Sequence, residues 1–522
     1  MPRRPKPKDG LTAGERVALY EAEQLERRRR MTDEGKRVDA VDSVTETGEF
    51  SQTATVEEET APEVVVQKPK KALPKPQTAT VRVDLSIPVG EIKPMHGMCN
   101  GPVSYGADIS GLFKEIGVPF VRFDATDTAV SAYAVDVSRI FKDPDADPSI
   151  PESYDFETTD KYVEAAMLCG AQIIYRLGES RDLLGGKKHI YDIDPEILSR
   201  AAVNIIRHYN DRWAGGYSFA LERFEIWNDA MLGGDDADFE LYRRLANAVK
   251  LYDEGLKVGG MSFDGFGERA RSFLRFCKKT RTPVDFITFD CFGSDPKAAA
   301  SDVEAFALSM RKLGFADTEI IIGKWSYIDG EALGDSSLAN ALVGCGEKNA
   351  AIRKKIFEEQ ASIRGAAYAA AFMIEMARAD GVALGCFYDA EPMISPFCAI
   401  ADRFGERLKP FYAFKAFGEL YRARESMLCE VAETEGYAHS GIHAAAARSQ
   451  SGECYIAVAS FGGCGTVDIR IDGISEELYT ADLYILDGVK NLSLCDSVAL
   501  SGGKKRIVLN VSEYGVVLIR LY

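Results

Sequence analysis

The sequence predicts an α/β protein in which a (β/α)8 barrel is followed by an antiparallel β-sandwich and preceded by a disordered polar tail. Three observations predict this. Eight apolar runs rich in Ile, Val and Phe alternate with stretches of helical periodicity over residues 95–425. Residues 426–522 change to short runs of alternating polarity. Residues 1–79 contain too few apolar side chains to offset the entropy of ordering them.

The N-terminal part, residues 1–79, is polar and charged, and we expect a disordered or partly helical tail. It contains four consecutive arginines at 27–30 and a Thr/Glu/Val/Pro-rich run that ends in lysines and prolines. Two interpretations remain open, a solvated linker and an arm that docks an acidic protein partner. Residues 80–94 form a strand-like lead-in, and its pairing with the C-terminal strands is left open.

Residues 95–425 contain eight strand–helix units, and eight in about 330 residues fit a closed barrel better than an open sheet. The strand-like runs are 95–102, 119–125, 172–180, 223–230, 256–263, 285–293, 319–327 and 381–391. Helical spacing is found at 158–169, 196–209, 239–253, 267–279, 301–313 and 352–378. In the C-terminal part, the predicted strands are 454–460, 466–471, 482–486, 506–510 and 515–521, separated by Gly, Asn and Asp clusters.

Composition limits the function classes. The net charge of −17 argues against nucleic acid, since neutralising phosphates requires a basic surface. No window approaches the roughly 18 apolar residues of a membrane span, and no signal peptide is recognisable. The eleven cysteines are scattered singly, without metal-type spacing, which favours reduced thiols in a cytoplasmic protein. No zinc, nucleotide or phosphate-loop motif is present, so we expect neither a metal nor a cofactor.

Polar and aromatic side chains collect where the predicted strands end. Barrels of this type build their sites from the C-terminal ends of the strands, and acids, amides and aromatic rings there suit a sugar or oligosaccharide. Trp325 is the expected stacking platform. The candidate residues are His96, Asn100, Arg122, Asp124, Glu179, Asn228, Asp229, Asp290, Lys324, Trp325, Tyr388 and Glu391.

Several of these segments resemble clan A glycoside hydrolases, especially family 39, the β-xylosidase and α-iduronidase group. Residues 224–230 (FEIWNDA) resemble the family's EIWNEP segment, and 319–325 (EIIIGKW) resemble its ITEW segment. Further similarities are found at 121–123 (VRF), 239–242 (FELY), 256–260 (LKVGG), 273–277 (FLRFC), 283–287 (PVDFI) and 409–415 (KPFYAFK). The resemblance implies a retaining glycosidase with two catalytic glutamates, and Asn228 as the group that binds the sugar 2-hydroxyl.

Both glutamates are replaced when the resemblance is carried over by position. Asp229 stands at the acid/base position and is shorter than glutamate by one carbon–carbon bond, about 1.5 Å. Lys324 stands at the nucleophile position, where an ammonium can neither form the glycosyl ester nor stabilise a positive transition state. Residues 290–292 read Asp-Cys-Phe where the family has His-Ala-Tyr, so the phenol that orients the nucleophile is also missing.

Three interpretations of this site remain open. Asp229 and Lys324 form an ion pair in a former catalytic site. Alternatively, other acids have taken over in an inverting mechanism; these are Glu391, Asp290, Asp124 and Glu179. Lastly, Lys324 is a nucleophilic amine that forms a Schiff base with a carbonyl substrate.

Three functions of the whole protein also remain open. The first is a sugar-binding protein whose hydrolysis is lost or reduced, and the second is an active xylosidase-like β-glycosidase. A third is an assembly protein that uses its N-terminal arm.

Overall fold

The computed structural model describes residues 77–104, 107–123, 134–180, 190, 193–226, 235–329, 347–391, 397–432, 441–463, 465–474, 479–500 and 505–522. The prediction of a polar tail therefore falls outside the described residues, apart from 77–79.

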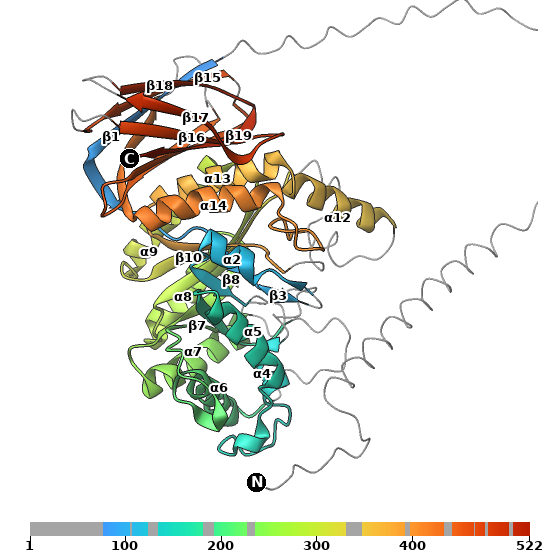
Figure 1. Cartoon of the computed structure of the whole chain (residues 1–522). Helices are drawn as coiled ribbons and strands as arrows, with labels where there is room; N and C mark the ends of the chain where they lie inside the picture. The colour runs from blue at the N-terminus through green and yellow to red at the C-terminus, as the bar shows by residue number, and fades with distance from the viewer. Residues whose placement is uncertain are drawn as a thin grey trace, which may run out of the picture. The chain divides into compact units, whose positions relative to one another are not determined.

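Eight parallel strands form the predicted closed barrel, in the order β10-β11-β2-β5-β6-β7-β8-β9 (Figure 1). Each overlaps one of the eight apolar runs, so the prediction of a barrel is confirmed. The strands are β2 (Gly97–Cys99), β5 (Phe120–Arg122), β6 (Gln172–Leu177), β7 (Arg223–Ile226), β8 (Lys257–Phe263), β9 (Phe286–Gly293), β10 (Glu319–Tyr327) and β11 (Val382–Phe387).

Helices follow the barrel strands, and their ends are fixed by local capping. Asp194 accepts hydrogen bonds from the backbone N–H groups of Glu196 and Ile197, which starts α6. The stretch 352–378 is two helices because Ser362 caps the second of them. The main helices are α2 (Ser110–Ile116), α5 (Glu157–Leu168), α6 (Pro195–Asn210), α7 (Asp235–Tyr252), α8 (Glu268–Thr280), α9 (Pro296–Leu313), α12 (Glu347–Gln360), α13 (Ile363–Arg378) and α14 (Lys409–Ala423).

The C-terminal strands join β1 in one nine-stranded sheet, in the order β17-β16-β19-β14-β13-β12-β1-β15-β18. Apolar side chains from all nine strands form one core. The predicted antiparallel strands are confirmed, while a division into two stacked sheets stays a prediction. The strands are β1 (Gln77–Glu91), β12 (Glu425–Ala432), β13 (Ile442–Arg448), β14 (Cys454–Phe461), β15 (Gly465–Asp472), β16 (Tyr479–Leu486), β17 (Asn491–Leu500), β18 (Lys505–Val511) and β19 (Tyr514–Leu521).

The lead-in strand belongs to this sheet rather than to the barrel. Val81 of β1 is opposite Val431 in an antiparallel pair and opposite Ile469 in a parallel pair. The structure therefore shows the pairing that the sequence left open. β1 ends at Glu91, a few residues before the first barrel strand, so the chain passes directly from the sheet into the barrel.

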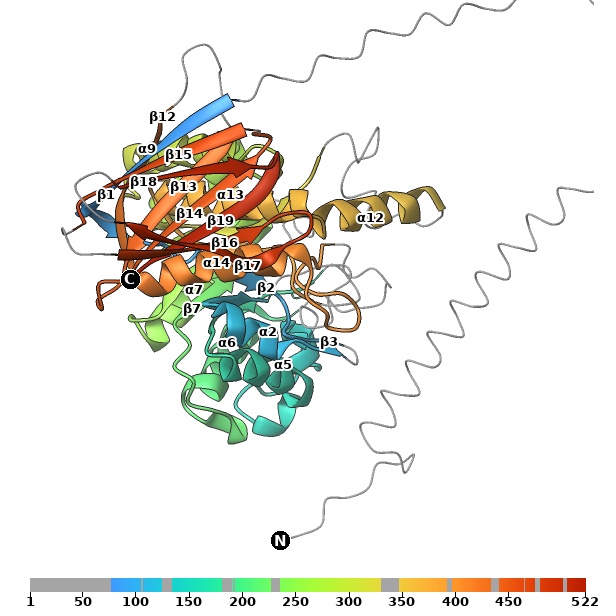
Figure 2. The ribbon, with the colours of Figure 1, turned by 45° about the horizontal axis from the view of Figure 1, so that its top comes forward.

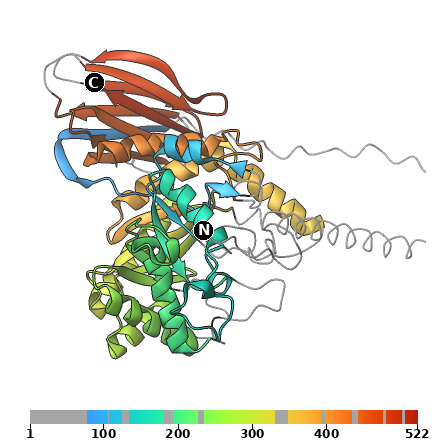
Figure 3. The ribbon, with the colours of Figure 1, turned by 60° about the horizontal axis from the view of Figure 1, so that its bottom comes forward.

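Helices α13 and α14 lie between the barrel and the C-terminal sheet (Figure 2, Figure 3). Phe372 of α13 and Phe414 of α14 share one buried core with Ala457 and Leu518 of the sheet. α13 is buried along most of its length and rich in alanine, which lets the sheet approach closely. The barrel and the sheet therefore pack through these two helices.

Two further sequence expectations concern cysteines and membranes. The nine cysteines in the described ranges are free thiols, six of them buried. In this same part of the chain, the helices are too short or too polar to cross a membrane.

Candidate functional site

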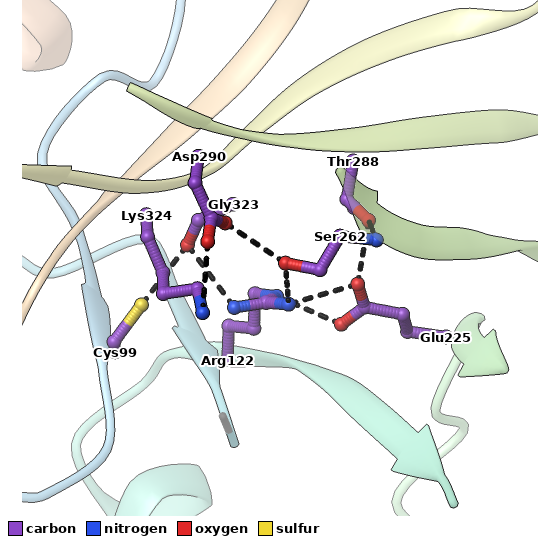
Figure 4. A network of polar contacts seen from close by, with 8 residues as sticks. All are labelled: Cys99, Arg122, Glu225, Ser262, Thr288, Asp290, Gly323 and Lys324. Carbon is purple, nitrogen blue, oxygen red and sulfur yellow. Dashed lines mark hydrogen bonds and ion pairs between the residues drawn. The ribbon is translucent and has the colours of Figure 1, made fainter. Parts of the chain in front are cut away.

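Two charged side chains that point into the barrel form a fully buried ion pair (Figure 4). Arg122 ends β5 and donates from Nε to Glu225 Oε2 at 2.7 Å and from Nη2 to Oε1 at 2.9 Å. Both side chains have zero exposure. Thr288 of β9 donates to the same carboxylate at 2.6 Å. Two parallel hydrogen bonds to one carboxylate are the strongest geometry that an arginine offers.

Ser262 of β8 connects this pair to a second one. Its hydroxyl accepts from Arg122 Nη2 at 3.1 Å and donates to Asp290 Oδ1 at 2.9 Å. Its backbone N–H donates to Thr288 Oγ1 at 2.7 Å, and its φ is 49°. Contacts from β5, across the barrel, and from the adjacent β9 therefore fix the serine hydroxyl of β8 between two charged groups.

The second ion pair joins β9 to β10. Lys324 Nζ lies 2.9 Å from Asp290 Oδ2, and the side chains are 16% and 8% exposed. The Tyr388 ring, just after β11, has its centroid 5.9 Å from the same ammonium. Unlike Arg122 and Glu225, these two side chains are reached by solvent.

A bulge at Gly323 turns Lys324 into the barrel. Ile322 is opposite Phe289 and Lys324 is opposite Asp290, so Gly323 is an extra residue in β10. A Cβ at Gly323 would lie 3.2 Å from Arg122 Cζ, so glycine leaves room for the guanidinium. The Gly323 carbonyl accepts from Arg122 Nη1 at 3.3 Å and Cys99 Sγ at 3.0 Å. Gly323 and Lys324 therefore both face inward.

The prediction that Trp325 is a stacking platform is wrong. Because of the bulge, Trp325 points outward into the helix layer, where it is fully buried. Its ring stacks on the rings of Phe372 and Phe414, with ring centroids 4.5 and 5.7 Å away. It therefore has no surface to offer a sugar.

His96 was also assigned to the wrong end of its strand. It comes directly before β2, whereas Asp290 and Lys324 lie in the C-terminal half of their strands. It is fully buried and packs against Phe417 and Tyr421 of α14, with ring centroids 5.4 and 4.9 Å away. Burial lowers the pKa of His96 to about 3. His96 is thus a neutral part of the barrel–helix core.

The lowered pKa of His96 predicts that acid destabilises the protein. An unfolded histidine binds a proton below its ordinary pKa, near 6.5, whereas folded His96 binds one only near pH 3. Its stabilising contribution is therefore present above pH 6.5 and is lost as pH falls through the window between these values. Urea unfolding at several pH values measures this. Between pH 6.5 and 3, the free energy of unfolding of His96→Phe should fall less with decreasing pH than that of wild type, by about 1.4 kcal/mol per pH unit. Parallel pH curves for the two proteins would contradict this.

The remaining described candidates lie after their strands, as predicted, and their role as sugar ligands stays a prediction. Asn100 follows β2 and is buried. Tyr388 packs against Phe292 with centroids 5.7 Å apart. Glu391 is fully buried and accepts from Ser104 Oγ at 2.9 Å. Both oxygens of Glu179 accept from Ser138, from the N–H and from the hydroxyl, each at 2.8 Å.

Three predicted residues lie outside the described residues. They are Asp124, Asn228 and Asp229. The ion pair expected between Asp229 and Lys324 therefore stays a prediction.

Five members of the network in Figure 4 are not among the residues predicted from the sequence, namely Cys99, Glu225, Ser262, Thr288 and Gly323. A usable signal existed for Glu225, since a charged residue inside an apolar barrel strand requires a counter-charge, and Arg122 lies within another such strand. In the described ranges, no cluster of His, Cys, Asp or Glu is arranged to hold a metal ion.

Comparison with known proteins agrees with this fold. The model of the glycosyl hydrolases family 39 matches residues 151–314. A β-xylosidase of Geobacillus stearothermophilus is 26% identical over 171 residues, which are 30% of this chain and 34% of that protein. The chain thus matches about a third of the length of this relative.

Solved structures extend the similarity to most of the chain. A glucosidase from Croceicoccus marinus has a TM-score of 0.67 at 22% identity and covers 85% of this chain and 99% of its own. A β-xylosidase from Caulobacter crescentus CB15 has a TM-score of 0.60 at 16% identity, covering 85% and 99%. The chain is therefore similar to family 39 glycosyl hydrolases over residues 151–314 and shares its fold with several glycosidases.

Proposed function

We propose that the protein binds a sugar at the mouth of the barrel and that hydrolysis of glycosides is lost or much reduced. The observation that carries this proposal is the ion pair of Lys324 with Asp290, 2.9 Å apart at a position that solvent reaches. By resemblance, Lys324 stands at the nucleophile position of family 39 enzymes. The similarity to a β-xylosidase and to a glucosidase supports a sugar as the ligand.

Retaining hydrolysis needs two carboxyl groups about 5–5.5 Å apart, one of which forms a bond to the sugar. The amine of Lys324 cannot form the glycosyl ester. Its positive charge also opposes the oxocarbenium-like transition state. Asp290, the acid beside it, accepts from Ser262 on one oxygen and pairs with the lysine through the other. Both of its oxygens are thus engaged, which disfavours Asp290 as a substitute nucleophile.

The alternative is an active β-glycosidase that uses a rearranged pair of acids. One observation favours it, since Glu391 is a fully buried carboxylate that follows β11. A buried carboxyl group is the type of group that enzymes use as a general acid. Glu391 also accepts a hydrogen bond from Ser104, which would hold it in one orientation.

Turnover and binding separate the two possibilities. We expect the intact chain to release no more aryl alcohol from aryl β-xylosides and β-glucosides than buffer does, between pH 4 and 8. Saturation-transfer NMR should show binding of the same glycosides. Glu391→Gln should leave both results unchanged. Turnover that this substitution abolishes would overturn the proposal in favour of the active glycosidase, and absence of any sugar binding would overturn both.

A further inference from the structure

We infer that the pair of Lys324 and Asp290 determines the charge of the ligand, so that the site accepts a neutral glycoside and discriminates against uronic acids and amino sugars. This inference rests on the proposed function, because it names the class of sugar that the same site binds.

The first observation is the balance of charge within the network (Figure 4). Arg122 is matched by Glu225 in a two-point contact, and Lys324 is matched by Asp290. Ser262 joins the pairs through one hydroxyl. The four charged groups of these two pairs sum to zero, so the two pairs together add no net charge to the site.

The second observation concerns which members of the network a ligand can reach. Arg122 and Glu225 have no exposed surface, whereas the side chains of Lys324 and Asp290 are 16% and 8% exposed. A ligand therefore meets one cation and one anion side by side. A uronate drawn to the ammonium would lie close to the Asp290 carboxylate, and an amino sugar drawn to Asp290 would lie close to the ammonium. In each case like-charge repulsion opposes the attraction.

A neutral sugar suits the same pair. An ammonium only donates hydrogen bonds and a carboxylate only accepts them. Neighbouring hydroxyl groups of a sugar can do both, one accepting from Lys324 while the next donates to Asp290. Ser262 is a positioning residue in this arrangement, because its bond to Oδ1 of Asp290 fixes how the carboxylate faces the lysine.

Binding of three matched glycosides tests the inference. The probes are phenyl β-glucoside, phenyl β-glucuronide and phenyl β-glucosaminide, and their dissociation constants are measured by calorimetry on the intact chain. We expect wild type to bind the glucoside at least tenfold more tightly than either charged probe. Asp290→Asn leaves the ammonium without this acid and should raise the glucuronide-to-glucoside affinity ratio at least tenfold. Lys324→Met should raise the glucosaminide-to-glucoside ratio similarly.

The control is an ion pair in the loop between β5 and α5. Lys142 and Asp155 are 64% and 46% exposed, and Lys142→Met should leave all three affinity ratios unchanged. Tighter binding of the glucuronide or the glucosaminide than of the glucoside by wild type would by itself overturn the inference. Ratios that stay constant in folded Asp290→Asn and Lys324→Met would also overturn it, while sugar binding itself would still support the proposed function. Failure of all three probes to bind wild type would overturn the proposed function as well.

Discussion

Arg122→Met is expected to lower the free energy of unfolding by about 3–5 kcal/mol, because it leaves the Glu225 carboxylate in the barrel without its cation. Arg122 and Glu225 are both fully buried and share two hydrogen bonds. Tryptophan fluorescence during urea unfolding measures the effect. The three tryptophans of the chain are residues 213, 227 and 325, so the signal reports on the barrel part of the sequence.

Two further variants test whether this loss of stability comes from a buried charge that has lost its partner. Arg122→Met combined with Glu225→Met should recover most of the loss, since removing both partners leaves no buried charge. Lys142→Met breaks an ion pair on the surface and should cost less than about 1 kcal/mol. Equal losses for Arg122→Met and Lys142→Met would show that the pair of Arg122 and Glu225 contributes little to stability.

The barrel could be predicted because its evidence is local. Each strand is an apolar run, and each helix that follows has apolar residues at helical spacing, so short windows of sequence contain both signals. Strand β13 was not predicted, because its sequence lacks such a local signal. Its residues Ile442–Arg448 include four consecutive alanines, which carry no strand preference. Tertiary packing places them in the sheet, where small side chains permit close contact with α13 and α14.

The site could be predicted only in part. The sequence placed Asp290 and Lys324 at strand ends, and the structure brings them into contact. It could not reveal this contact, because the register between β9 and β10 depends on the extra residue at Gly323. A strand with simple alternation puts Gly323 and Trp325 on the same face. The bulge exchanges the faces of Lys324 and Trp325, and no local pattern distinguishes Gly323 from an ordinary buried glycine.

The outward position of Trp325 predicts a loss of stability rather than of sugar binding when the ring is removed. Trp325 is fully buried between the barrel and the rings of Phe372 and Phe414. Trp325→Ala should therefore lower the free energy of unfolding by about 3–5 kcal/mol. Trp325→Phe keeps an aromatic ring there and should cost less. Calorimetry on both folded variants should give affinities for phenyl β-glucoside that match wild type, since the indole faces α13 and α14 rather than the mouth. A stable Trp325→Ala protein that no longer binds the glycoside would instead place the indole in the sugar site.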